Sequence, residues 1–186
     1  MTRLRKYWKR IFSALLAVIL VAGIGFYVWA STPSGELMPT ALQALESSES
    51  VDFTRDDWLV FIPIEDIQTT GFIFYPGGRV LVDAYAPLGQ AIAEDGYLAV
   101  FVPMPLNLAV LNVDGANAVI EAYPEIDHWV IGGHSLGGAM AARYAYNNPD
   151  AVDGLVMMAA FPEAQFDFTE RELAVASIYG SEDGLA

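Results

Sequence analysis

The sequence predicts an α/β domain with a mainly parallel sheet and helices on both of its faces, preceded by one N-terminal transmembrane helix. Two observations predict the domain. After residue 50, short apolar runs alternate with amphipathic stretches, as in a sheet with helical crossovers, and the run Tyr97–Val102 is apolar throughout, as in a strand buried on both faces. A third observation predicts the membrane helix, because no charged residue occurs from Ile11 to Ala30.

This uncharged run is long enough to cross a bilayer once. At about 1.5 Å per residue it spans roughly 30 Å as a helix, which is the thickness of the hydrocarbon core. Five basic residues in segment 1–10 precede it and place that segment in the cytoplasm and the domain on the extracytoplasmic side. A cleaved signal peptide is the alternative, since Val28–Ala30 suits a cleavage site, but signal h-regions are usually only about 7 to 15 residues long. We expect an uncleaved signal anchor at 11–30.

Residues 31–50 are predicted to be a linker from the membrane to the domain at 51–186. The segment contains Pro33, Gly35, Pro39 and a Ser-Glu cluster, and its periodicity is weak apart from a short helical stretch near Leu42 to Leu45.

Strands and helices are then predicted in alternation. The strands are short apolar runs, at 58–62, 71–75, 97–102, 128–132, 155–159 and 175–179. The helices end near helix-breaking residues, and they are predicted at 85–94 before Gly96, at 112–123 before Pro124 and at 136–147 before Pro149.

The charge and composition exclude several classes of function. From residue 31 onward there are 4 basic and 23 acidic residues, a net charge of −19, which argues against a nucleic acid as partner. The chain has no cysteine, so disulfides, thiolate metal sites and a cysteine nucleophile are excluded. No metal-ligand cluster, phosphate loop or dinucleotide fingerprint occurs, and no cofactor or metal is therefore implied.

The segment between the predicted strand at 128–132 and the helix at 136–147 matches the nucleophile elbow G-x-S-x-G, with Ser135 at its centre. Such a serine needs a strained turn so that its hydroxyl projects from the carboxyl edge of the sheet, and the flanking glycines keep strand and helix from colliding. The helix that follows directs its N-terminal dipole at charge developing on the substrate. A glycine-rich turn without chemistry is the alternative reading.

Two further features fit the same mechanism. An oxyanion hole would combine the amide of Leu136 with one from the Pro76-Gly77-Gly78 turn, where Gly77 and Gly78 let the backbone approach the substrate oxygen. The turn after the last predicted strand carries Asp183, the candidate triad carboxylate, with Glu182 as the alternative. An ordinary turn remains the other interpretation of each segment.

These residues resemble the α/β-hydrolase superfamily and, more narrowly, the group called alpha/beta hydrolase fold-5. The stretches that carry the resemblance are GFIFYPGG at 71–78, VPMPLNLA at 102–109, WVIGGHSLGG at 129–138 and SIYGSEDG at 177–184. The resemblance implies an esterase-like serine hydrolase with Ser135 as nucleophile, Asp183 as the carboxylate and a histidine further along the chain as the base.

That histidine is where the sequence departs from the family pattern. Only His128 and His134 occur. His128 begins the strand that ends near Ser135, roughly 23 Å away at about 3.3 Å per residue. His134 adjoins the nucleophile, and we expect its side chain to point into the protein. We therefore expect a fragment, C-terminally incomplete and truncated before its catalytic histidine, and nearly inactive by itself because general-base assistance contributes roughly 10²- to 10⁴-fold.

Three functional hypotheses follow. The first is a membrane-tethered hydrolase acting on a small-molecule ester or related acyl substrate, and the second transfers the acyl group to an acceptor other than water. The third is a catalytically inactive, membrane-anchored interaction module. Three aromatic residues between the elbow and Asp183 either line an acyl pocket or pack in the core: Phe161, Phe166 and Phe168.

Overall fold

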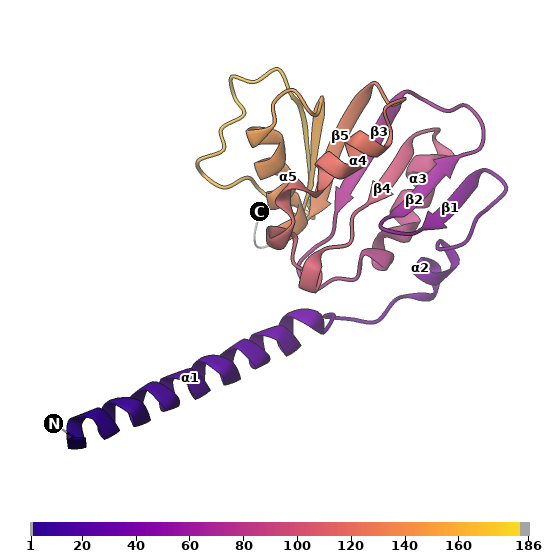
Figure 1. Cartoon of the computed structure of the whole chain (residues 1–186). Coiled ribbons are helices and arrows are strands. Elements are labelled where there is room, and N and C mark those ends of the chain that lie inside the picture. Colours follow the sequence, from indigo (N-terminus) through magenta and orange to yellow (C-terminus); the bar gives the residue numbers. More distant parts are fainter. Residues whose placement is uncertain (1, 183–186) are drawn as a thin grey trace. The chain divides into compact units, whose positions relative to one another are not determined.

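A computed structural model describes residues 2–182, and Asp183 lies outside the described residues. The chain divides into two compact units, one ending at Thr32 and one beginning at Pro33. Figure 1 shows their helices and strands. Each unit is described separately.

The first unit is a single helix, α1 (Thr2–Ser31). Its segment Tyr7–Ser31 is long and apolar enough to cross a membrane, and a signal sequence near an N-terminus would share these properties. The first unit is therefore either a membrane span or a signal sequence by length and composition.

The second unit contains a seven-stranded sheet with the order β1-β2-β4-β3-β5-β6-β7 (Figure 1). The two N-terminal strands form an antiparallel hairpin that joins β4 antiparallel, whereas β4, β3, β5, β6 and β7 are all parallel. The mainly parallel sheet predicted from the sequence is confirmed. The strands are β1 (Val51–Arg55), β2 (Leu59–Pro63), β3 (Thr70–Tyr75), β4 (Leu98–Phe101), β5 (His128–His134), β6 (Gly154–Met158) and β7 (Ala174–Ile178).

Helices cover both faces of this sheet. The helix α3 (Ala86–Glu94) packs on one face, and α4 (Ala116–Ala122) and α5 (Leu136–Asn147) pack on the other. Alternate side chains of each central strand enter the two cores, so that Ile73 faces α5 while Phe74 faces α3. Both faces of the central strands are thus buried, which explains their continuous apolar runs.

The structure adds elements that the sequence did not predict. The strand β1 has mostly exposed side chains, and only Val51 and Phe53 pack in the core, so its apolar pattern is too short to predict a strand. A short helix, α2 (Pro39–Gln43), lies in the segment predicted to be a linker. Ala44 and Glu46 there accept hydrogen bonds from the buried Gln90 of α3, at 3.2 and 2.8 Å, so this part of the segment belongs to the globular unit.

The predicted helix at 112–123 is wrong in its first turn. That turn is a 3₁₀ helix, η4 (Val113–Gly115), and the α-helix begins at Ala116. The buried hydroxyl of Tyr75 lies between the two, donating to the carbonyl of Val113 and accepting from the amide of Ala116, both at 2.8 Å. This side chain replaces the backbone pairing that a continuous helix would have made. Three further 3₁₀ helices are η1 (Val82–Tyr85), η2 (Pro105–Asn107) and η3 (Ala109–Leu111).

Candidate active site

The strand order reverses at β3, and the candidate site lies at the carboxyl edge of that strand. The chain passes from β3 to β4 on one side and then returns to β5 on the other side of β3. Loops leaving two such strands diverge, and ligands of open α/β sheets bind in the crevice between them. Ser135 follows β5 and the Pro76–Gly78 turn follows β3, so both candidate segments meet at this crevice.

Ser135 has a backbone conformation that residues with a side chain rarely adopt. Its φ is 51° and its ψ is −120°, between the last residue of β5 and the first residue of α5. Its amide donates to the carbonyl of Met158 at 2.9 Å, and its carbonyl accepts from the amide of Ala139 at 3.1 Å. These two bonds fix the turn from β6 on one side and from α5 on the other, and so hold a strained conformation in place.

Glycines allow the close packing that this turn requires. A Cβ atom at Gly133 would lie 2.5 Å from the carbonyl carbon of Gly137, and one at Gly137 would collide with the carbonyl oxygens of Tyr75 and Pro76. The start of α5 therefore lies directly against the end of β3. The sequence argument for the flanking glycines has a steric basis in this contact.

Other strained residues surround Ser135 in the loops of the same sheet edge. Six non-glycine residues have positive φ among the described residues, and five of them follow the parallel strands β3, β4, β5 and β6: Arg79, Leu106, Asn107, Ser135 and Ala159. Such conformations cost roughly 1 to 3 kcal/mol each and gather at functional sites. The strained residues thus gather at the same sheet edge as Ser135.

The two predicted oxyanion glycines differ in their hydrogen bonding. The Gly77 amide donates to the Tyr85 hydroxyl at 3.1 Å, so it is already engaged. The Gly78 amide has no hydrogen-bond partner among residues 2–182. Gly78 also lies beside Leu136, whose Cδ2 atom would be 3.3 Å from a Cβ at Gly78. Leu136 contributes the first amide of α5, which has no partner within the helix.

His134 is bound to Tyr85 instead of to Ser135. Its Nδ1 atom lies 2.9 Å from the Tyr85 hydroxyl, and the two rings are 5.8 Å apart between centroids. Burial lowers the pKa of His134. Burial also raises the pKa of Tyr85, against the opposing effect of the hydrogen bond from Gly77. Both side chains are therefore neutral near pH 7.

His128 lies at the other end of β5 from Ser135. Its Nδ1 atom is 3.3 Å from a carboxylate oxygen of Asp153, and both side chains are largely exposed. Within residues 2–182, no hydrogen bond joins either histidine to the Ser135 hydroxyl. The described residues thus provide Ser135 with no histidine base. Of the two candidate carboxylates, Glu182 is described and exposed, and Asp183 is outside the described residues.

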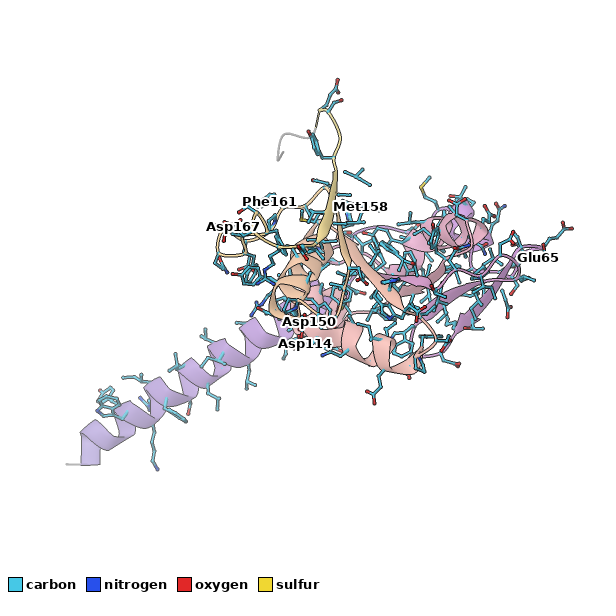
Figure 2. The ribbon with its side chains drawn as sticks, turned by 90° about the horizontal axis from the view of Figure 1, so that it is seen from above. Glu65, Asp114, Asp150, Met158, Phe161 and Asp167 are labelled. Carbon is cyan, nitrogen blue, oxygen red and sulfur yellow. The ribbon has the colours of Figure 1, made fainter. Side chains whose placement is uncertain are left out.

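A cavity of about 770 Å³ opens beside Ser135. Its lining is mostly apolar and comes from the elbow, the segment after β6 and the end of β7: Ser135, Leu136, Ala139, Ala159, Ala160, Phe161, Ser177, Tyr179, Gly180 and Ser181. Phe161 follows β6 and is 68% exposed (Figure 2). Phe166 and Phe168 instead pack on Tyr146 of α5, with centroids 5.0 and 5.8 Å away. Only the first of the three aromatic candidates lines the cavity.

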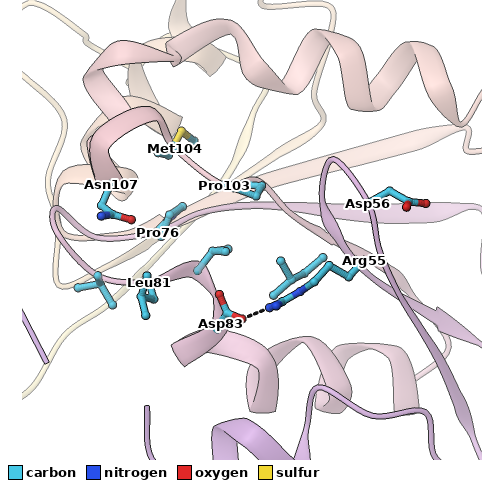
Figure 3. Close-up of a pocket in the computed structure, with 11 residues that line it drawn as sticks. Arg55, Asp56, Pro76, Leu81, Asp83, Pro103, Met104 and Asn107 are labelled. Carbon is cyan, nitrogen blue, oxygen red and sulfur yellow. Dashed lines mark ion pairs between the residues drawn. The ribbon is translucent and has the colours of Figure 1, made fainter. Parts of the chain in front are cut away.

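A smaller cavity of about 270 Å³ lies where the β1–β2 turn meets the loops that follow β3 and β4. Figure 3 shows the ion pair of Arg55 with Asp83 on one side of it and Met104 and Asn107 on the other. Ser135 does not line it. Within residues 2–182, no three His, Asp or Glu side chains are grouped closely enough to hold a metal ion.

Comparison with known proteins supports this description of the fold. Residues 71–186 match the model of the alpha/beta hydrolase family. A hormone-sensitive lipase from a metagenome library has a similar structure, with a TM-score of 0.51 and 16% identity over 66% of this chain and 49% of that one. A bacterial heroin esterase gives a TM-score of 0.52 and 18% identity over 67% of this chain and 49% of that one. No curated protein matches the sequence.

The chain therefore spans about half the length of these two structures. At such low identity, the similarity concerns the fold alone.

Proposed function

Because the chain belongs to the alpha/beta hydrolase family, we propose that it is a serine hydrolase that cleaves an ester or related acyl bond through an acyl-enzyme on Ser135. The observation that carries this proposal is the strained Ser135 backbone beside the 770 Å³ cavity, close to the amides of Leu136 and Gly78, which have no hydrogen-bond partner among residues 2–182. A turn without chemistry would relieve such strain with glycine, since glycine adopts positive φ at no steric cost.

In the proposed reaction, the Ser135 oxygen attacks the substrate carbonyl carbon while its proton passes to a base. The carbonyl π electrons move onto oxygen, and the oxyanion accepts hydrogen bonds from the amides of Leu136 and Gly78. Collapse of this intermediate breaks the bond to the alcohol, which leaves with the proton. Water then attacks the acyl-enzyme in the same way, releasing the acid and restoring the serine.

The proposed base is a histidine that is not one of the two in these 186 residues. His134 is occupied by Tyr85, and His128 lies at the wrong end of β5. Asp183 is the proposed carboxylate that orients the base, with Glu182 as the alternative, because the turn after β7 reaches the same sheet edge as Ser135. Without its base, the chain is proposed to be nearly inactive.

The substrate is proposed to be a small molecule with an apolar acyl group. The cavity wall between Leu136 and Phe161 is apolar, which favours acyl chains over charged groups. We also propose that residues 11–30 anchor the protein in a membrane, after a cytoplasmic segment 1–10, and that the hydrolase domain at 51–186 lies on the extracytoplasmic side. Of the predicted linker at 31–50, the part from Ala44 to Glu46 is joined to α3 by hydrogen bonds and belongs to the globular unit.

A fluorophosphonate probe tests the catalytic proposal, because it labels an activated serine covalently. We expect the protein expressed from its complete open reading frame to be labelled and the Ser135→Ala variant to remain unlabelled. The 186-residue chain should be labelled at least about 100-fold more slowly, since it lacks general-base assistance. Circular dichroism of each sample checks that the protein is folded.

Two other outcomes distinguish the alternatives. Absence of labelling in a folded full-length protein would contradict the serine hydrolase and support the non-catalytic module. Labelling without release of free acid from an ester would indicate transfer of the acyl group to an acceptor other than water.

A further inference from the structure

Gly77, Tyr85 and the distant His134 are linked by hydrogen bonds behind the proposed oxyanion site. The Gly77 amide donates to the Tyr85 hydroxyl at 3.1 Å, and that hydroxyl lies 2.9 Å from Nδ1 of His134. Gly77 belongs to the turn after β3, and His134 immediately precedes the nucleophile. These two hydrogen bonds therefore join the two loops that meet at the site.

We propose that Tyr85 and His134 are positioning residues that hold the Pro76–Gly78 turn so that the Gly78 amide faces the substrate oxygen. This inference rests on the proposed function, and it assigns a task to a histidine that cannot serve as the base. Neither side chain is proposed to touch the substrate.

The donors and acceptors that the three groups carry determine which group donates in each of these hydrogen bonds. A tyrosine hydroxyl has one proton to donate, and a neutral imidazole has one donor and one acceptor nitrogen. Since the Tyr85 oxygen accepts from Gly77, its own proton is satisfied only if it donates to Nδ1. The opposite arrangement leaves the hydroxyl proton without an acceptor among the described residues. His134 is therefore the tautomer with its proton on Nε2.

Packing holds the tyrosine in this place. The Tyr85 ring lies 4.7 Å from the Phe74 ring between centroids, on the strand that leads into the turn. A Cβ atom at Gly77 would be 2.7 Å from Nδ1 of His134 and 3.0 Å from the Tyr85 oxygen, so only glycine permits the contact. Position 77 thus carries a glycine for these hydrogen bonds, and position 78 carries one for approach to the substrate.

On its far side, the turn is held by hydrogen bonds to other segments, among them two from Ser34 to the Arg79 carbonyl, from its amide at 2.7 Å and from its hydroxyl at 3.2 Å. The Arg79 amide donates to the carbonyl of Asn107 at 2.7 Å, and the Val80 amide donates to the carbonyl of Gly77 at 3.1 Å. The first of these bonds restrains the turn relative to the loop after β4, and the second closes the turn itself. The Tyr85 hydroxyl adds a hydrogen-bonded link between Gly77 of the turn and His134, the residue before Ser135, and an oxyanion hole requires these two segments to keep their relative position.

Loss of this restraint should affect the transition state more than substrate binding. Removing an oxyanion donor outright costs about 10²- to 10³-fold in kcat, and misplacing one costs less. In the full-length protein we expect Tyr85→Phe to lower kcat for a p-nitrophenyl ester about 10- to 100-fold, with KM within about two-fold. His134→Leu should match it, whereas His134→Asn should retain much of kcat because its Oδ1 atom can accept the tyrosine proton.

The matched control is Tyr144→Phe, which removes another buried tyrosine hydroxyl. That hydroxyl donates to Oδ1 of Asn117 at 2.6 Å, joining α5 to α4, and makes no contact with the turn. We expect this variant to lose stability by a similar amount and to keep its kcat. A common loss of kcat in both tyrosine variants would overturn the positioning role in favour of a general loss of structure.

Two measurements do not depend on catalysis. Nitrogen NMR shifts of His134 should show a protonated Nε2, and amide hydrogen exchange at Gly77 should quicken in Tyr85→Phe but not in Tyr144→Phe. If Gly77 loses protection and kcat is unchanged, the positioning role is wrong although the hydrogen bond exists. If the folded wild-type protein neither labels nor hydrolyses esters, the proposed function fails, and the positioning role fails with it even where NMR detects these hydrogen bonds.

Discussion

At the scale of single residues, backbone strain and the proposed catalytic role oppose each other at Ser135. Its φ of 51° and ψ of −120° favour glycine, and a serine remains there at a cost of roughly 1 to 3 kcal/mol. Ser135→Gly relieves this strain but gains backbone entropy in the unfolded chain, worth about 0.5 to 1 kcal/mol. We expect Ser135→Gly to have a free energy of unfolding about 1 kcal/mol higher than Ser135→Ala, measured by urea denaturation.

The comparison with Ser135→Ala separates strain from chemistry, because both variants lack the hydroxyl. The same pair of substitutions at Ser177, in the extended strand β7, provides the control. There we expect glycine to be the less stable of the two by about 0.5 to 1 kcal/mol. An equal or lower stability for Ser135→Gly than for Ser135→Ala would show that the turn is not strained.

The strand, turn and helix around the proposed nucleophile Ser135 are predicted well from the sequence, since their signal is local. Strand, glycine-flanked serine and helix are consecutive, and each part can be recognised from its neighbours. Tyr85 could not be found in this way, because it lies 49 residues from His134 and sits at the start of an ordinary amphipathic helix. The hydrogen bond from the Gly77 amide to Tyr85 could not be predicted either, because both glycines of the turn fit the motif equally well.

At the scale of helices and strands, hydrogen bonds with two tyrosine hydroxyls hold α4 in place. Tyr75 binds its first turn from β3, and Tyr144 binds Asn117 from α5. Burial raises the pKa of Tyr144 to about 12, and burial raises the pKa of Tyr75 as well. Both phenols therefore stay protonated in the folded protein at pH values where an exposed tyrosine, with a pKa of about 10, ionises.

The sign of the resulting pH dependence follows from proton binding. Above about pH 10 the unfolded chain loses these protons while the folded chain keeps them, so the free energy of unfolding falls as the pH rises from 10 toward 12. The contribution is complete below about pH 10. We expect the urea midpoint of Tyr144→Phe to fall less steeply than that of the wild type between about pH 10 and 12. Parallel slopes would contradict the assignment of a buried, protonated phenol.

Prediction of the elements succeeded where a segment is buried on a defined face. The helix at 136–147 was predicted with the bounds that the structure gives, since a run of small residues follows the glycine-serine elbow and Pro149 follows the run. The strand β1 was missed because its side chains are mostly exposed and it depends on backbone pairing with β2. The first turn of the helix at 112–123 was wrong because Tyr75, distant in sequence, determines where that helix begins.

At the scale of the whole chain, the order of the strands could not be predicted from their sequences. The apolar runs of β3, β4 and β5 are interchangeable as patterns, yet the reversal at β3 is what brings the Pro76–Gly78 turn beside Ser135.

The net charge, in contrast, follows directly from the composition. Acidic side chains such as Glu65 and Asp167 lie at opposite ends of the globular unit (Figure 2), consistent with a solvated surface that repels polyanions.

The asymmetry between a basic, apolar N-terminal segment and an acidic remainder leads to a prediction about location. If residues 11–30 are an uncleaved anchor, the protein should sediment with membranes, resist extraction by alkaline carbonate and retain its N-terminal basic residues by intact mass. Ile19→Lys places a charge near the centre of the apolar run and costs about 3 to 4 kcal/mol in insertion, whereas Ile19→Leu costs little. We therefore expect only the lysine variant to leave the membrane fraction. Recovery of a soluble chain whose intact mass corresponds to an N-terminus at Ser31 would instead identify the segment as a cleaved signal peptide. The acidic domain would then be exported without a membrane anchor.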